Sequence, residues 1–190
     1  TCQSSTPPTA ALTSMGSSVV YVPTGKAAAY TAAWGTSTTA IIIEKDIEVT
    51  VNVTEAGKLA TTIYAQTSIH PSLVTKLTVT GVLNASDITY IRDNMKQCYV
   101  VDLTGINLTD LPTDAFNGRS FLFSIKLPAG LKTIGSGAFS GCSNIRTIDF
   151  PASLTSIGVS AFNGCSSLTV IDAPASLSSI GTNAFCGCSN

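Results

Sequence analysis

The dipeptide Ala-Phe occurs four times in the last third of the chain, always at the same interval. Its copies end at Phe116, Phe139, Phe162 and Phe185, each 23 residues after the one before. Two further columns keep this interval, one of prolines and one of cysteines: Pro128, Pro151, Pro174, Cys142, Cys165 and Cys188. Three columns in step define a structural repeat, so this part of the chain must be built from similar units that stack on one another.

Within one unit the apolar residues fit neither a helix nor a long strand. In residues 151–173 they follow neither a 3.6-residue period nor strict alternation. We therefore expect a coil that changes direction every few residues and sends one side chain inward at each corner. Each coil contains one short strand-like segment, and stacking would pair these segments into a parallel sheet. The segments are 122–127, 145–150 and 168–173.

The repeat consensus LPxxLxxIGxxAFxGCxxLxxIxx resembles the BspA-type leucine-rich repeat, closely over residues 127–190 and more loosely over 98–126. The resemblance implies an α/β fold, a right-handed solenoid with a parallel β-sheet on its concave face. It also implies a secreted or cell-surface protein of Bacteroides-like bacteria that acts in adhesion or protein–protein contact.

Two stretches ahead of the repeats extend this resemblance. KLTVTGVLNASDITYIRD (76–93) is similar to the module that precedes such repeats, and VYVPTGKAAAYTAAW (20–34) to the segment that closes such an array. We therefore expect three parts: a closing segment of a preceding array at 1–43, a strand and helix capping module at 44–97, and repeats at 98–190, the last incomplete. Residues 1–43 have two explanations, an excised fragment that spans two arrays or a segment that packs on the open coil of another subunit.

Local patterns predict the elements of the first half. Residues 47–53 alternate between apolar and polar, as in a half-buried strand. We expect a helix capped by Thr54 that runs to about residue 66, and a second helix at about 87–96 with Ser86 as N-cap. A strand at 18–22 and a helix at 26–34 are expected nearer the N-terminus.

Composition excludes several classes of function. The chain is 44% hydrophobic but only 11% charged, and its formal net charge is −1; ordinary domains have about 25% charged residues. Since no basic stripe exists, nucleic-acid binding is not expected. No apolar run exceeds four residues, as at 40–43, and such runs are too short to span a membrane. The first residues do not have the pattern of a signal peptide, so a mature or excised portion is expected.

The sequence offers no catalytic, cofactor or metal site. The single histidine, His70, cannot complete a zinc set with the cysteines, and no G-x-S-x-G motif accompanies it. Asp102, Asp149 and Asp172 share one strand column, so we expect them in a row on a solvent-facing sheet rather than across a cleft. A non-enzymatic protein without a cofactor is predicted.

The solvent-facing side of the predicted sheet is the candidate interaction face. Tyr99 and Phe123 are expected to be neighbours with Arg146 beside them, which is the composition of an interaction hot spot. Coverage of these rings by the N-terminal segment is the alternative. The candidate residues are Lys76, Tyr99, Asp102, Phe123, Lys126, Arg146, Asp149, Thr169 and Asp172.

The repeated phenylalanines and cysteines are predicted to form the interior. Phe116, Phe139, Phe162 and Phe185 should stack, while Cys142, Cys165 and Cys188 should form a ladder of buried free thiols. The chain is thus predicted to be an extracellular or cell-surface module for adhesion or protein–protein interaction, with a host or bacterial protein as partner. Head-to-tail self-assembly into a filament, through residues 1–43 and the open C-terminal coil, is the alternative.

Overall fold

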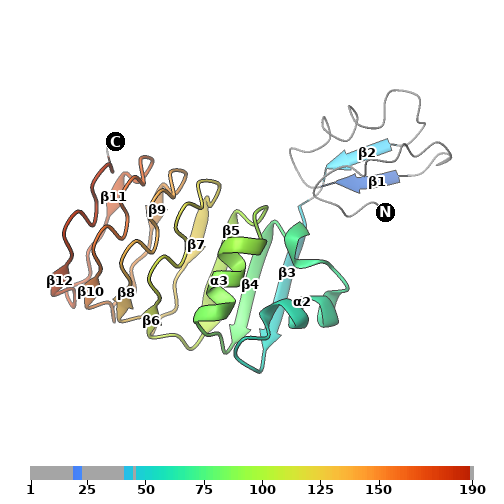
Figure 1. The fold of residues 1–190 in the computed structure, drawn as a ribbon, viewed down its shortest axis with the longest axis horizontal. Helices are drawn as coiled ribbons and strands as arrows, with labels where there is room; N and C mark the ends of the chain where they lie inside the picture. Colours follow the sequence, from blue (N-terminus) through green and yellow to red (C-terminus); the bar gives the residue numbers. More distant parts are fainter. Residues whose placement is uncertain (1–18, 23–40, 45, 189–190) are drawn as a thin grey trace.

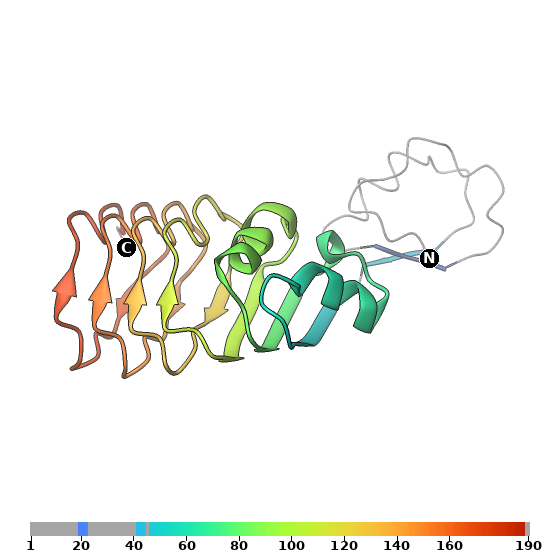
Figure 2. The ribbon, with the colours of Figure 1, turned by 60° about the horizontal axis from the view of Figure 1, so that its bottom comes forward.

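The computed structural model describes residues 19–22, 41–44 and 46–188. Strand β1 (Val19–Val22), expected from the sequence, pairs in parallel with β2 (Ile41–Glu44). The helix expected at 26–34 lies outside the described residues. From residue 46 onward the chain winds into stacked coils, which Figures 1 and 2 show side by side from the capping region to the last repeat.

One parallel sheet runs through the first coils. The alternating segment forms β3 (Glu48–Val53), which buries every second residue. It pairs with β4 (Lys76–Gly81), which pairs with β5 (Val100–Ile106), which pairs with β7 (Ser124–Lys126). In the next coils β9 (Thr147–Ile148) follows β7 and pairs with β11 (Val170–Ile171).

A second parallel sheet, which the sequence interpretation did not include, lines another side of the repeat coils. Its strands have two residues each: β6 (Asp110–Leu111), β8 (Thr133–Ile134), β10 (Ser156–Ile157) and β12 (Ser179–Ile180). Neighbouring partners such as Ser156 and Ser179 are one repeat apart. The expectation of one strand per coil was therefore incomplete.

A glycine after each of the last three strands of this sheet lets the coils approach. A Cβ atom on Gly158 would lie 2.5 Å from the backbone nitrogen of Ser136, and one on Gly181 would lie 2.4 Å from that of Val159. Real Cβ atoms do not come so close to backbone atoms, so a side chain at these positions would push the coils apart.

The phenylalanines form the predicted stack along the interior. Successive ring centroids are 5.5, 5.0 and 5.2 Å apart, and the planes differ by 11° or less. Phe116, Phe139 and Phe162 are fully buried, whereas Phe185 in the last described coil is half-buried. Stacked aromatic rings at this separation attract one another beyond their burial, so the column ties each coil to the next.

The cysteines of the repeat are free thiols, as expected. The Cys142 Sγ donates to the carbonyl oxygen of Phe116, and the Cys165 Sγ to that of Phe139, each at 3.1 Å. Both side chains are buried, whereas Cys188 is half-buried. Burial raises the pKa of the Cys142 and Cys165 thiols to about 12, which keeps them protonated and unreactive.

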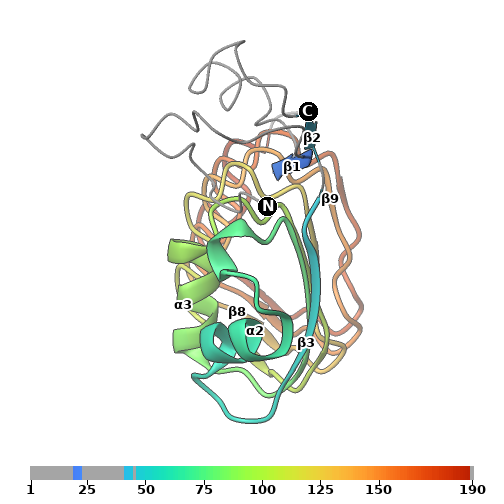
Figure 3. The same ribbon diagram turned by 90° about the vertical axis from the view of Figure 1, so that its right-hand side faces the viewer.

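Two helices lie on the opposite side of the coils from the first sheet (Figure 3). They are α2 (Leu59–Thr67) and α3 (Ala85–Asn94), and a 3₁₀ turn, η1 (Pro71–Leu73), follows α2. The expected apolar stripe of α3, Ile88, Ile91 and Met95, is fully buried.

Both predicted helix caps are wrong. The N-cap of α3 is Asn84 rather than Ser86: its side chain accepts from the backbone of residues 86 and 87, and Asp87 completes a capping box. Thr54 does not cap α2. Instead the buried carboxylate of Asp87 accepts from the backbone nitrogens of Gly57, at 2.6 Å, and Leu59, at 3.0 Å. The cap of α2 therefore comes from the other helix, which no local pattern reveals.

Candidate interaction surface

The first repeat coil departs from the other coils at three neighbouring columns. Arg119 stands where the later coils have Cys142, Cys165 and Cys188. Phe121 stands in the column of Asn144 and Ser167, and Phe123 in the column of Arg146 and Thr169. In the five-residue segment 119–123, one cation thus replaces cysteine and two aromatic rings replace polar residues.

Arg119 joins the repeats to helix α3. Its side chain is 4% exposed, and its guanidinium donates to the carbonyl oxygens of Ile91, Met95 and Cys98. These carbonyls lie at or just after the C-terminal end of α3, where a positive charge is favoured. The carbonyl oxygens of Ile91 and Met95 also accept from the backbone nitrogens of Met95 and Cys98. Burial lowers the pKa of Arg119 below its usual value. The residue therefore closes the end of α3 and fixes the start of the 119–123 segment.

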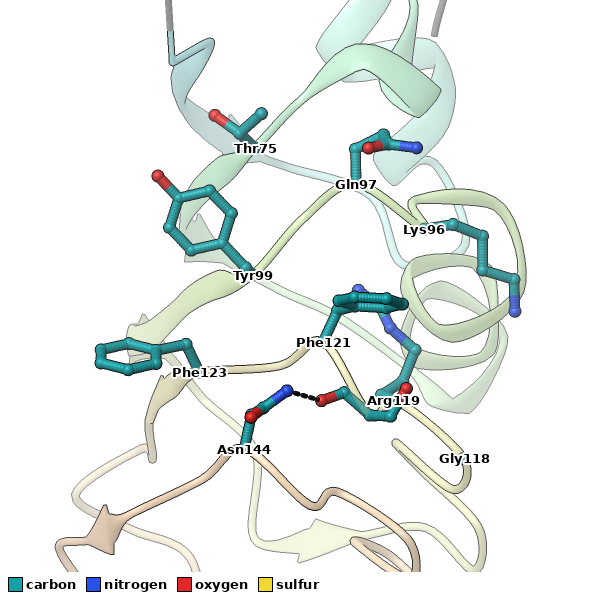
Figure 4. A pocket seen from close by; sticks show the side chains of 10 residues that line it. Thr75, Lys96, Gln97, Tyr99, Gly118, Arg119, Phe121, Phe123 and Asn144 are labelled. Atoms are coloured by element: carbon teal, nitrogen blue, oxygen red, sulfur yellow. Dashed lines mark hydrogen bonds between the residues drawn. The ribbon is translucent and has the colours of Figure 1, made fainter. Parts of the chain in front are cut away.

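This segment forms one wall of an open groove of about 860 Å³ (Figure 4). The groove extends over the residues between α3 and β5, where Lys96, Gln97 and Tyr99 contribute its other wall. Phe121 is 74% exposed and Phe123 is 52% exposed. Since large rings with this much exposure are unusual on a surface otherwise rich in serine and threonine, the groove is the prominent apolar feature of this side of the molecule.

Hydrogen bonds hold the groove in one shape. The Phe123 backbone nitrogen donates to the carbonyl oxygen of Tyr99 at 2.8 Å, which sets the two residues on adjacent coils. The Tyr99 hydroxyl donates to Asp46 at 2.7 Å, and burial together with this bond raises the pKa of Tyr99. Asn144 of the following coil donates to the Ser120 carbonyl oxygen at 2.6 Å, as drawn in Figure 4.

The predicted face residues divide into three groups. Tyr99 and Phe123 line the groove, on adjacent coils as expected. Lys76, Asp102 and Lys126 are engaged in ion pairs on the sheet: Lys76 with Glu48 and Asp46, and Lys126 with Asp102 at 2.9 Å. The hydrogen bonds of Lys76 to its two carboxylates raise its pKa.

The remaining predicted residues lie on later coils, outside the groove. Arg146, Asp149, Thr169 and Asp172 are exposed, and none of them lines the groove. In the described part of the chain the side chains of Arg146, Asp149 and Asp172 form no hydrogen bond or ion pair. Arg146 occupies the column of Phe123 on the following coil, but it is not among the residues that line the groove, whereas Asn144 and Phe121 are.

Phe121 and Arg119 are the residues that sequence interpretation missed. Both could have been found from the repeat itself, because each breaks a column that is otherwise small and mostly polar or composed of cysteine. Phe121 lies two residues before Phe123, outside the solvent-facing strand positions from which the candidate face was predicted.

The described residues contain no group of three or more His, Cys, Asp or Glu side chains that could hold a metal ion. Within the same ranges no helix has the length and apolarity needed to cross a membrane. Among the described residues, the groove lining includes no carboxylate and no histidine.

The chain matches one family model, described as the BspA type leucine rich repeat region, in six copies over residues 85–190. A comparison with curated proteins gives no match. Among solved structures it is similar to a leucine-rich repeat protein of T. pallidum, TpLRR, at 30% identity and a TM-score of 0.50, over 61% of this chain and 56% of that one.

Two further solved structures are similar at lower identity. A leucine-rich repeat protein from Bacteroides ovatus has 24% identity and a TM-score of 0.49, over 90% of this chain and 35% of that one. A leucine rich cell surface protein from Faecalibacterium prausnitzii has 18% identity and a TM-score of 0.44, over 76% and 46%. The chain thus spans little more than half of TpLRR and less than half of the other two.

Proposed function

Because the chain belongs to the family of BspA-type leucine-rich repeats, whose modules generally bind proteins and are not enzymes, we propose that it is a non-enzymatic module for protein recognition outside the cell or at its surface. Its role is adhesion to a host or bacterial protein. The division into a closing segment (1–43), a capping module (44–97) and repeats (98–190) is part of this proposal.

The observation that carries the proposal is the pair of exposed rings, Phe121 and Phe123, in a coil that otherwise follows the repeat. Exposed aromatic side chains at the centre of a groove with polar neighbours have the composition of an interface hot spot. The two coils that follow show that the repeat can be built without these rings, since Asn144 and Thr169 occupy the same columns there. Function rather than folding is the better explanation of their presence.

The test uses a variant that restores the repeat, Phe121→Asn with Phe123→Thr. The intact chain and this variant are immobilised and exposed to the same mixture of extracellular proteins from host epithelium and neighbouring bacteria, and bound proteins are measured by quantitative mass spectrometry. We expect at least one protein that binds saturably to the intact chain and at least tenfold less to the variant, because hot-spot residues contribute about 2 kcal/mol or more each.

A matched control is Val159→Thr. It removes a half-exposed apolar side chain from the other side of the coils and restores the column of Thr182. Binding should be unchanged in this control. The proposal is overturned if every bound protein binds equally to the intact chain and to the Phe121/Phe123 variant.

Head-to-tail self-assembly is the second candidate, and one observation favours it. Apolar side chains of the last described coil are exposed, with Val170 at 59% and Ile180 at 55%. A copy of the chain could cover this coil with its residues 1–43, and such contacts between unlike surfaces form filaments when they do not close. Deleting residues 1–43 should then abolish oligomers, and a truncated chain that still polymerises would exclude this route.

A further inference from the structure

The groove lined by Tyr99, Phe121 and Phe123 also carries a charge pattern that indicates its ligand. Resting on the proposed function, we infer that it recognises an acidic peptide segment of the partner protein. An apolar side chain of that segment lies on Phe121 and Phe123, and neighbouring carboxylates lie toward Lys96.

The sign of the charge is the first argument. The cationic side chains that line the groove are Lys96 and Arg119, and no carboxylate lines it within the described residues. The chain as a whole carries a formal net charge of −1. The groove is therefore a local cationic area on a weakly acidic protein, and an anionic segment is the complementary partner.

The hydrogen-bond partners of these two cations leave their charge in place. Arg119 donates to backbone carbonyl oxygens and not to a carboxylate. Lys96 donates to the Arg92 carbonyl oxygen at 2.9 Å. The negative end of a helix dipole amounts to about half a charge, so the C-terminus of α3 offsets only part of the two positive charges. Asp93 pairs with Arg92 and also interacts electrostatically with Lys96 and Arg119, so this one carboxylate offsets a further part of the charge of the three cations.

The polar rim supplies groups for a peptide backbone. The Gln97 side chain lines the groove and forms no hydrogen bond within the described residues. An amide offers both a donor and an acceptor, which matches the N–H and C=O groups of an extended peptide. Lys96 uses one of its three donors on Arg92 and keeps the others for a ligand.

The experiment selects random twelve-residue peptides displayed on phage against the intact chain, with depletion on the Phe121→Asn, Phe123→Thr variant. We expect enriched peptides that combine an aromatic or large aliphatic residue with two or more Asp or Glu residues. The best peptide, synthesised with a fluorescent label, is then titrated by fluorescence polarisation. Its affinity should fall at least tenfold in the double variant.

Charge is tested separately with Lys96→Gln. An exposed ion pair contributes up to about 1 kcal/mol, so the affinity for the acidic peptide should fall about two- to fivefold. Lys132→Gln makes the same charge change on an exposed lysine outside the groove and should leave the affinity unchanged.

The inference is overturned if the enriched peptides are neutral or basic, if no peptide is enriched, or if the peptide binds Lys96→Gln and Lys132→Gln with equal affinity. The proposed function fails differently, because its test asks only whether a protein depends on Phe121 and Phe123. A captured protein that depends on Phe121 and Phe123 but binds through a segment that is not acidic would support the proposed function and contradict the inference of an acidic ligand.

Discussion

At the scale of single residues, stability depends on side chains that fill the same place in successive coils. Phe139 and Phe162 each stack against a ring on both sides, whereas Phe185 stacks against Phe162 and is half-buried. We predict that Phe139→Ala and Phe162→Ala lower the free energy of unfolding by about 3–5 kcal/mol, and that Phe185→Ala lowers it by clearly less. Urea unfolding followed by circular dichroism measures this. Equal losses at all three positions would contradict the burial difference.

Arg119 is predicted to matter for stability although it is a charged residue. Replacing it with Met removes charged donors from three carbonyl groups at the end of α3, of which those of Ile91 and Met95 keep a backbone donor. Hydrogen bonds from a charged group contribute about 1.5–3 kcal/mol each. We expect a loss of about 3 kcal/mol and faster amide hydrogen exchange in α3. Arg146→Met, which changes an exposed arginine without partners among the described residues, should change stability by less than about 0.5 kcal/mol. Similar losses in both variants would show that Arg119 has no special role.

The buried thiols predict a loss of stability at alkaline pH. Folding raises the pKa of Cys142 and Cys165 from an ordinary value near 9 to about 12. The folded state therefore holds these protons more tightly, and this contribution is complete below pH 9 and is lost as the pH rises toward 12. Relative to a Cys142→Ala, Cys165→Ala variant in reducing buffer, the intact chain should lose stability between pH 9 and 10.5. A constant difference over that range would contradict the prediction.

At the scale of elements, the sequence predicted whatever is encoded by its own periodicity. Strand β3 could be predicted because its residues alternate between apolar and polar. The segments that contain β7, β9 and β11 could be predicted because they recur at the interval of the repeat. The N-cap of α2 was not predictable in this way, since Asp87 supplies it from 28 residues away. The second sheet was missed for a different reason, because β8 and β10 are defined by their pairing with neighbouring coils and not by a pattern in their own sequence.

The second sheet gives a prediction about how closely the coils stack. Gly158→Ala would place a Cβ atom 2.5 Å from the preceding coil, and overpacking of this kind costs about 1–3 kcal/mol. Gly130→Ala is the matched control, because nothing lies within 4 Å of its Cβ position and its φ is not positive. Thermal unfolding should show a clear loss for Gly158→Ala and almost none for Gly130→Ala. If the two variants unfold alike, the close approach is not important.

At the scale of the whole molecule, the repeat determines the shape and its exceptions indicate the function. Regular columns predicted the stacked coils and the buried phenylalanines. The candidate site was predicted in part: Tyr99 and Phe123 lie in the groove, but Arg146 does not, and Phe121 and Arg119 were overlooked. The groove forms where the end of α3 meets the first repeat coil. Arg119 makes that contact with Ile91 and Met95, more than twenty residues away in sequence, so local sequence patterns do not reveal it.

We propose that the chain uses this groove to bind a different protein and does not associate with copies of itself. Light scattering coupled to size exclusion, over concentrations from micromolar to several hundred micromolar, tests this claim most directly. We predict one species with the mass of a single chain, 19.5 kDa, at every concentration. Species that grow with concentration and disappear on deletion of residues 1–43 would contradict the account and establish self-assembly in its place.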